Sequence, residues 1–345
     1  MTNLPVHAGL DYHQGSIQTC VVDETGRQLL NRRCRNDVVE VAEAIRSRGE
    51  VRSVAIESCC GAAEFAETLH AATGWPVTLA HPGYVNRMKV NPDKTDFSDA
   101  RLLADLDRVG YIPKVWLAPR EIRELRTLVR RRQSCVERQK AAKLQLTSLL
   151  RTRRMTSPEW AGSRWSLRWM EWIRTVAASE NERWTIDSML EDLAYLKNQI
   201  RRAETRLKMV TRDDQTVAFL QTLPNIGPVT AWVMRAEIVR ASRFRTGKQL
   251  ARFCGTSPRN CSSGERVADS GLIRAGNPHL KTVIIQAAQR LRRCDPRWSV
   301  FANRLERAGK PACVVVGAVA NRWVRWLFHR LKEFEASMRT ESCMA

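Results

Sequence analysis

The amino-acid sequence predicts an α/β N-terminal domain followed by a helical coiled-coil arm and a mainly α-helical C-terminal domain. Three observations lead to this fold class. Strand-like and helix-like segments alternate over residues 6–81, two long stretches then keep helical periodicity, and shorter helical segments separated by loops follow. We expect the domains to span residues 1–112, 113–212 and 213–345.

The first domain begins with three apolar runs that read as strands, at residues 6–11, 16–23 and 27–34. The Glu-Thr-Gly turn at residues 24–26 favours a hairpin between the second and third runs. The next elements are expected in this order: a helix over 37–49, a strand over 51–58, a helix over 62–74 and a strand over 76–81. A mixed sheet that begins with a three-strand meander has the element order of the ribonuclease H-like fold.

Two long helices are expected over residues 120–150 and 183–210. In the second, apolar residues step by three and four from Ile186 to Val210, and the first keeps a partial seam, so they could form an antiparallel arm or a dimer interface. The stretch that joins them contains five tryptophans: Trp160, Trp165, Trp169, Trp172 and Trp184. We favour packing against the helices over a role as stacking platforms for bases.

The charge of the chain is +21 and is unevenly distributed. Residues 1–112 carry 12 Lys and Arg against 15 Asp and Glu, whereas residues 240–332 carry 20 against 4. A strongly basic remainder predicts a polyanionic partner, with nucleic acid as the default. A membrane surface is disfavoured, because no basic amphipathic helix stands alone.

The ten cysteines do not follow a zinc-site or disulfide pattern. Cys59 and Cys60 are adjacent, and Cys254 and Cys261 have no His or Cys pair at zinc spacing. Reduced thiols in a cytoplasmic protein fit best. We find no signal peptide and no apolar run of about 18 residues that would span a bilayer.

Four acidic residues occupy positions that the predicted sheet would bring together. Asp11 ends the first strand and Glu57 the fourth, and these strands are parallel neighbours in a ribonuclease H-like sheet. Asp96 and Asp99 lie one turn apart at the start of an apolar helix and face the same way. A solvated helix N-terminus is the simpler explanation for the pair. Four converging carboxylates would repel one another, however, and two cations about 4 Å apart would relieve that repulsion, so the full set favours a metal site.

The segment LPNIGPVTA at residues 223–231 is typical of a helix-hairpin-helix turn. Gly227 would let a partner approach the backbone, and Pro228 can open the next helix, whose free amides suit a phosphate. An ordinary tight turn between two helices explains the pattern equally well. Later in the chain a basic cluster is either a solvated helix face or, as the local charge favours, a set of phosphate contacts: Arg293, Arg297, Arg304, Arg307 and Lys310.

Five segments together resemble the IS110 family of insertion-sequence transposases: GLDYHQGS, AIESCCG, NPDKTDFSDARLLADL, LPNIGPVTA and CGTSPRNCSSGERVADSGLIRAGNPHLK. They occur in the order and spacing of that family over nearly the whole chain. Members are DEDD enzymes with a RuvC-like N-terminal domain, a coiled-coil insertion and a C-terminal transposase domain, and they include the bridge RNA-guided recombinases. One segment departs from the pattern, because Ser58, Cys59, Cys60 and Gly61 follow Glu57 where a Thr-Gly and an aromatic residue are common.

The resemblance implies the roles of individual residues. It makes Asp11, Glu57, Asp96 and Asp99 the ligands of Mg²⁺, with Mn²⁺ as a possible substitute. It makes a serine of NCSSGE the nucleophile that joins a DNA phosphate, and Ser263 matches the family position better than Ser262. We expect further contacts to nucleic acid from these residues: Lys94, Gly227, Arg259, Arg266, Arg274, Arg293 and Arg297.

The same resemblance implies the partners. We expect double-stranded DNA at the element ends and the target, a structured guide RNA, and a second protomer whose acidic tetrad meets the serine, so that the protein acts as a dimer or tetramer. Its place of action would be the bacterial cytoplasm, at the nucleoid.

Other functions stay open at this point. A junction-resolving nuclease would use the tetrad and let water attack, and a non-catalytic nucleic-acid-binding protein would leave the acids solvated. A serine beside Gly264 in a polar loop is commonly only a turn residue, and it lacks a His/Asp partner at recognisable spacing. A sugar kinase shares a similar strand pattern but needs glycine-rich phosphate loops and leaves the net charge unexplained.

Overall fold

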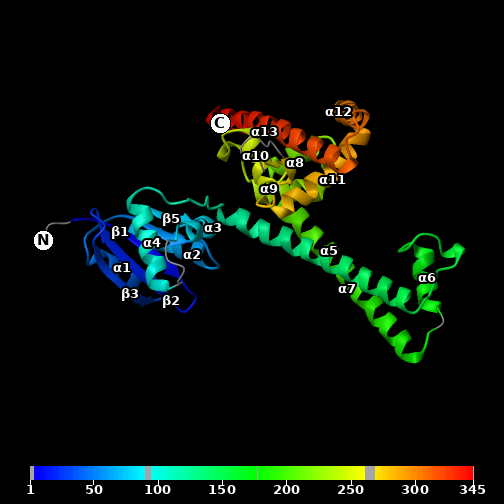
Figure 1. Cartoon of the computed structure of the whole chain (residues 1–345), viewed down its shortest axis with the longest axis horizontal. Helices are drawn as coiled ribbons and strands as arrows, with labels where there is room; N and C mark the ends of the chain where they lie inside the picture. Colours follow the sequence, from blue (N-terminus) through cyan, green and yellow to red (C-terminus); the bar gives the residue numbers. More distant parts are fainter. Residues whose placement is uncertain (1–3, 90–94, 177, 261–268, 345) are drawn as a thin grey trace. The chain divides into compact units, whose positions relative to one another are not determined.

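The computed structural model describes residues 4–89, 95–176, 178–260 and 269–344. The chain divides into two compact units, Met1–Ala118 and Pro119–Ala345, which are described separately below (Figure 1). The following cysteines are free thiols: Cys20, Cys34, Cys59, Cys60, Cys135, Cys254, Cys294 and Cys313. No helix within those ranges is both long enough and apolar enough to cross a membrane.

The first unit is built on one five-stranded sheet with the order β3-β2-β1-β4-β5. The strands are β1 (Pro5–Tyr12), β2 (Ser16–Asp23), β3 (Gln28–Arg35), β4 (Glu50–Glu57) and β5 (Val77–Ala80). β1 pairs antiparallel with β2 and parallel with β4, and β2 and β3 form the expected hairpin. The predicted mixed, ribonuclease H-like sheet is therefore confirmed.

Helices cover both faces of this sheet. They are α1 (Val38–Arg46), α2 (Ala62–Thr73), the short α3 (Pro82–Val85) and η1 (Asn86–Met88), and α4 (Asp96–Arg108). α1 and α2 close the main core through Ile45 and Leu69, which pack with Ile56 of β4. α4 lies on the opposite face, where Leu103 packs against Ala55 (Figure 1). Neighbouring residues of β4 thus enter different cores, as strand alternation requires.

The second unit begins with two long helices, α5 (Arg120–Thr152) and α7 (Glu180–Val210), which lie side by side (Figure 1). Both agree with the predicted helices to within three residues. The connection between them contains η2 (Glu159–Ala161) and α6 (Leu167–Thr175). Trp169 and Trp172 are buried in a small core with α5 and α7, as predicted. Trp160 and Trp184 are 52% and 73% exposed, so these two do not pack as we expected.

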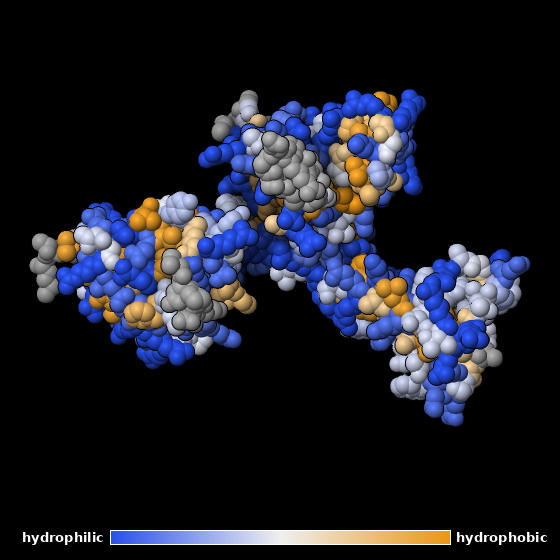
Figure 2. Space-filling model, viewed as in Figure 1, coloured by the Kyte–Doolittle hydropathy of each residue, from blue (hydrophilic) through white to orange (hydrophobic). Residues whose placement is uncertain are grey.

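The rest of the second unit is mainly helical. Its elements are α8 (Gln215–Thr222), α9 (Pro228–Ile238), η3 (Ala241–Arg243), α10 (Gly247–Phe253), β6 (Pro258–Asn260), β7 (Asp269–Leu272), α11 (Pro278–Cys294), α12 (Pro296–Arg307) and α13 (Ala312–Met344). Trp232, Ile284 and Trp323 are buried in its core, and Val129 and Leu207 belong to the same core. The beginning of α5 and the end of α7 are therefore fixed to the C-terminal helices. Hydrophilic side chains cover most of the visible face of this unit (Figure 2).

Candidate functional site

A glycine allows α4 to lie directly on β1. A Cβ atom at Gly9 would overlap the carbonyl oxygen of Ala100 and the amide nitrogen of Ala104. Thr95 caps the helix by accepting a hydrogen bond from the amide of Ser98 at 3.2 Å, which fixes where the helix begins. This close approach brings the first turn of α4 to the end of β1.

Three potential metal ligands meet at that point. Asp11 is only 9% exposed, near the end of β1. The Nε2 atom of His13 lies 3.3 Å from Oδ2 of Asp11 and 3.3 Å from Oδ1 of Asp96. One donor atom from each of the three residues lies within 4.8 Å of the other two. This spacing suits one shared cation.

The raised pKa of Asp11 also favours a bound cation at this point. Burial raises the pKa of its carboxyl above the usual 3.8, and the nearby carboxylates of Asp96 and Asp99 raise it further, while His13 opposes the shift. A cation between these carboxylates would remove the repulsion and stabilise the ionised form of Asp11.

Asp99 is paired with a lysine in this structure. Its side chain is buried, and Oδ1 lies 2.6 Å from Nζ of Lys89. The sequence had not predicted this pair, and Lys94, which we expect to contact nucleic acid, lies outside the described residues. The ammonium group of Lys89 supplies one of the positive charges that this acidic cluster needs.

Glu57 ends the strand beside Asp11. The last parallel pair of β1 and β4 is Leu10 with Ile56, so the next residues of the two strands are Asp11 and Glu57. Burial raises the pKa of the Cys59 thiol, and the carboxylates of Glu57 and then Asp11 raise it further. The carboxylates at the ends of β4 and β1 therefore both lie close enough to the Cys59 thiol to raise its pKa.

The acidic cluster fits a hard divalent cation. Carboxylate oxygens from Asp11 and Asp96 are ligands that Mg²⁺ and Mn²⁺ prefer, and an imidazole nitrogen is compatible with Mn²⁺. His13 was missing from the predicted ligands. Its position two residues after the strand-ending aspartate was the available signal, since a residue there lies in the turn beyond the same strand.

The expected nucleophile, Ser263, and its neighbours Ser262 and Arg266 lie outside the described residues. The structure does describe both ends of the segment that contains them. β6 and β7 pair antiparallel, a ribbon that the sequence had not predicted. Arg259 on β6 and Arg274 just after β7 are exposed.

Two glycines hold the ends of this segment together. A Cβ atom at Gly276 would overlap the Cα and amide nitrogen of Gly255. The amide of Asn277 also donates to the carbonyl oxygen of Phe253 at 2.7 Å. These contacts explain the Cys-Gly-Thr and Ala-Gly-Asn motifs, because each supplies the small residue that the close backbone approach requires.

The turn before α9 has the predicted form. α8 ends at Thr222, Gly227 is the N-cap residue of α9, and Pro228 is its first residue. A Cβ atom at Gly227 would meet no described atom within 4 Å, so packing inside the chain does not require this glycine. The turn lines a groove of about 650 Å³, whose basic lining residues are Arg132, Lys140 and Arg290.

The late basic cluster lies on exposed helix surface. Arg293, Arg304 and Arg307 are exposed, as is Lys310. The guanidinium group of Arg297 lies over the rings of Trp298 and Trp326, at 5.2 and 5.6 Å from their centroids. Aromatic rings hold that cation in place while it stays exposed to solvent.

Comparison with known proteins agrees with the fold and the acidic cluster. Residues 8–154 match the DEDD transposase model of the IS110 family, described as Transposase, and residues 217–303 match the model described as Transposase IS116/IS110/IS902 family.

Individual relatives give the same result. The chain is 26% identical over 330 residues to the transposase for insertion sequence element IS1111A of Coxiella burnetii, covering 92% of this chain and 88% of that protein. It is 28% identical over 292 residues to a probable family 20 transposase of Pseudomonas aeruginosa, covering 80% and 82% of the two chains. It is also 26% identical to the transposase for IS1328 of Yersinia enterocolitica, covering 79% and 81%. The chain thus belongs to the IS110 family of transposases, enzymes that cleave DNA and transfer its strands, with a DEDD N-terminal domain and a Transposase_20 C-terminal domain.

Proposed function

We propose that this transposase cleaves and rejoins DNA through a covalent phosphoserine at Ser263, with divalent metal bound by Asp11, Glu57, Asp96 and Asp99. The observation that carries the proposal is the meeting of Asp11, His13 and Asp96 within 4.8 Å, beside the buried Asp99. The raised pKa of Asp11 supports it, because burial and then the carboxylates of Asp96 and Asp99 disfavour the ionised carboxyl, which a bound cation would favour.

The metal, when bound, would supply a Lewis acid that polarises the scissile phosphate and favours loss of the serine proton. Asp11 and Asp96 would hold it from two different elements, and His13 would keep both carboxylates oriented. Lys89 would release Asp99 for coordination and move its own charge toward the incoming phosphate.

The serine step exchanges one phosphate ester for another. The hydroxyl oxygen of Ser263 forms a bond to a DNA phosphorus, the bond from that phosphorus to one deoxyribose oxygen breaks, and this oxygen leaves with a proton. Attack by a hydroxyl group of a second strand then breaks the phosphoserine bond and returns the proton to Ser263. No net water is consumed, so the strands are rejoined rather than hydrolysed.

Nucleic acid would be held by the basic surface of the second unit. Arg259 and Arg274 lie at the two ends of the serine segment, and Arg297 and Arg293 lie on exposed helix surface, where each can contact a phosphate. Gly227 would let a phosphate reach the free amides of α9. Lys94 and Arg266 complete the proposed set.

The active assembly would be a dimer or tetramer in which the serine of one protomer meets the acidic tetrad of another. The relatives named above come from bacteria, which supports a place of action on the bacterial nucleoid in the cytoplasm.

A structured RNA encoded by the element would select the target DNA. Sequencing the RNA that copurifies with the protein tests the guide: a discrete RNA from beside the gene supports it, and random cellular RNA contradicts it.

Serine substitution tests the mechanism. Ser263→Ala should abolish strand exchange and the covalent protein–DNA adduct that denaturing gels detect, whereas Ser262→Ala, the matched control, should keep both. If Ser263→Ala still cuts DNA, water is the nucleophile and the protein is a junction-resolving nuclease. If Asp11→Ala leaves every DNA reaction intact, the acidic cluster has no catalytic role.

A further inference from the structure

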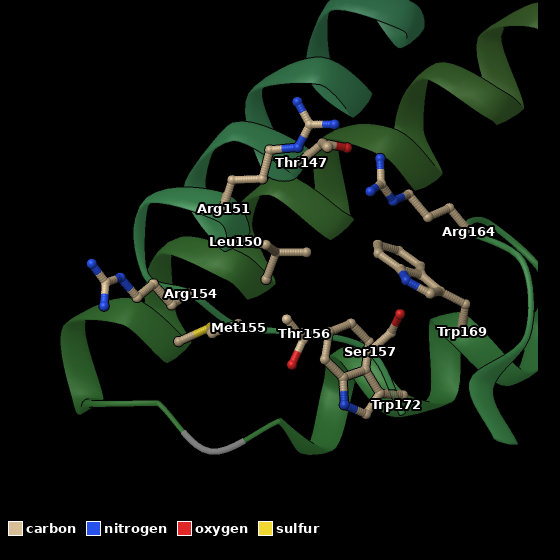
Figure 3. A pocket seen from close by; sticks show the side chains of 10 residues that line it. All are labelled: Thr147, Leu150, Arg151, Arg154, Met155, Thr156, Ser157, Arg164, Trp169 and Trp172. Atoms are coloured by element: carbon tan, nitrogen blue, oxygen red, sulfur yellow. The ribbon is translucent and has the colours of Figure 1, made fainter. Parts of the chain in front are cut away.

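The connection between α5 and α7 forms a basic groove that none of the proposed DNA contacts uses. One pocket of about 510 Å³ lies between the end of α5 and the α6 segment (Figure 3). A second pocket of about 360 Å³ shares Thr147, Arg151 and Arg164 with it and adds Lys140 and Lys143. We call the two together the arm groove.

The shape of the arm groove is set by a buried floor and charged rims. Leu150 and Trp169 are buried beneath it. Figure 3 shows Arg151 and Arg164 reaching from opposite sides toward the Thr147 end, while Arg154 extends outward at the other end. The floor keeps the arginines apart and leaves a hollow between their guanidinium groups.

The described part of the chain does not neutralise the positive charge in this groove. No acidic residue lines either pocket in the described part of the chain. Arg151, Arg154 and Arg164 are exposed, and none forms an ion pair with a described residue. In contrast, the adjacent Arg153 pairs with Glu182 at 2.9 Å, and Arg183 pairs with Asp187 at 2.8 Å. The three groove arginines therefore differ from these two neighbours in having no carboxylate partner among the described residues.

The backbone at the groove departs from its preferred conformation. Arg154, just after the C-cap residue of α5, has φ +51°, and Trp165 has φ +69°. Glycine is the usual residue where a helix ends in this left-handed conformation. Here the chain places an arginine and a tryptophan instead, and both line the groove. Strained non-glycine residues cluster at functional sites such as ligand clamps, where the surrounding structure holds them in place.

We propose that the arm groove binds the phosphate groups of single-stranded nucleic acid, without reading its sequence. Three guanidinium groups line one hollow, and each fork can donate two hydrogen bonds to one phosphate of a flexible strand. Trp165 adds a partly exposed ring with Lys143 above it at 5.0 Å, the combination of aromatic and basic groups found where single strands bind. A duplex has its bases paired inside and presents a stiff convex surface, which does not enter a hollow of this size.

The experiment measures binding of the full-length protein to oligonucleotides of about 16 nucleotides, at the upper end of single-strand site sizes. Fluorescence anisotropy is recorded over a salt series with oligo-dT, with oligo-U and with a duplex of the same length. Each phosphate contact to a single strand contributes about 0.7 to the slope of log K against log salt concentration. Replacing Arg151, Arg154 and Arg164 together by Gln should therefore flatten the slope by about 2 for at least one of the single strands.

The matched control replaces three exposed arginines of the same region that do not line the groove: Arg153, Arg168 and Arg174. It removes the same formal charge but none of the proposed groove contacts, so it should leave the slope nearly unchanged. Replacing the three groove arginines by Lys should restore much of the slope, because the charges return without the planar forks. Hydrogen exchange should slow around residues 150–166 when the single strand binds, and far-UV circular dichroism checks that each variant keeps its helices.

Each outcome of this experiment either supports or overturns the proposal. Slower exchange with oligo-U alone, oligo-dT alone or both supports the proposal and tells which nucleic acid is bound. Equal slopes for the groove variant and the wild type overturn it, and so does an equal loss in the control variant. Protection by the duplex but by neither single strand also overturns it. These readouts do not require catalysis, so they are independent of the proposed serine chemistry.

Discussion

The side-chain amide of Asn277 donates a hydrogen bond to Oε2 of Glu237 at 2.8 Å. Glu237 is 2% exposed at the end of α9, and Asn277 is the N-cap residue of α11, where its Oδ1 accepts from the next amides of the helix. Arg130 completes the site by donating to Glu237 at 2.9 Å from α5. A single buried carboxylate thus joins the long helix, α9 and the start of α11.

We expect Glu237→Ala to destabilise the second unit by about 1–3 kcal/mol, because it leaves the side-chain amide of Asn277 and the half-exposed guanidinium group of Arg130 without their buried acceptor. Chemical denaturation followed by circular dichroism measures the change. Glu204→Ala is the control, since Glu204 is 33% exposed and pairs with Arg132 near the surface, where such pairs contribute less than about 1 kcal/mol. Equal losses in the two variants would contradict the structural role assigned to Glu237.

Gly9→Ala should displace α4 from the sheet. The added methyl group would overlap the backbone of Ala100 and Ala104, neither of which can rotate away, so a loss of at least about 1–3 kcal/mol is expected. Because α4 carries Asp96 and Asp99, metal-dependent cleavage should also fall. Thermal melting and a cleavage assay measure the two effects. Gly15→Ala, where the methyl group would meet no described atom within 4 Å, should change neither.

Asp11→Asn should stabilise the protein at neutral pH when metal is absent. Burial raises the folded-state pKa of Asp11 above 3.8, so the favourable contribution of its protonated form is complete below that value and is lost as pH rises through the raised pKa. At pH 7 the buried carboxylate therefore opposes folding. Removing the charge should raise the melting temperature by roughly 2–8 °C for each kcal/mol recovered.

Thermal melts in a chelating buffer, repeated from neutral to strongly acidic pH, check this prediction. The advantage of Asp11→Asn should disappear in acid, where the wild-type carboxyl is protonated. Added Mg²⁺ should raise the melting temperature of the wild type and have little effect on the variant. If Asp11→Asn were less stable than the wild type at pH 7 without metal, the ionised carboxyl of Asp11 would not oppose folding, and the prediction would be wrong.

His13→Ala should weaken Mn²⁺ binding by about 10–100-fold, the usual range for residues that ligate or orient metal ligands. Its imidazole contacts both Asp11 and Asp96, so its loss frees the two carboxylates to move apart. Titration of free Mn²⁺ by electron paramagnetic resonance measures the affinity without any catalytic assay. His70→Ala serves as the comparison, because the imidazole of His70 bonds to the carbonyl oxygen of Trp75, away from the acidic cluster, and the change should leave the affinity unchanged.

Much of the architecture could be predicted from the sequence, because periodicity reflects local burial. The apolar runs of β1, β2 and β4 and the seam from Ile186 to Val210 each led to the element that the structure contains. The neighbourhood of Asp11 and Glu57 followed from a general property of parallel strands, whose carboxyl ends meet at one edge. Predicting these features required only the residue pattern within one element, or one rule for how parallel strands pair.

Other features depend on which distant segments meet, and no pattern within one segment encodes that. Lys89 pairs with Asp99, and His13 bridges Asp11 and Asp96, only because Gly9 lets α4 rest on β1. The tryptophans of the connection likewise look equivalent in the sequence. Their sorting into buried and exposed depends on where α6 packs against the two long helices.

The contact between Gly255 and Gly276 has an evolutionary consequence. The two ends of the serine segment are held together at this contact. A change in the number of residues between them therefore costs little loop-closure entropy. Near this contact the buried Thr256 and Ile273 accept hydrogen bonds from Asn321 and Lys281, so these positions tie the stretch to the helices. Selection can therefore change the length and sequence around the proposed nucleophile while the helical scaffold stays the same.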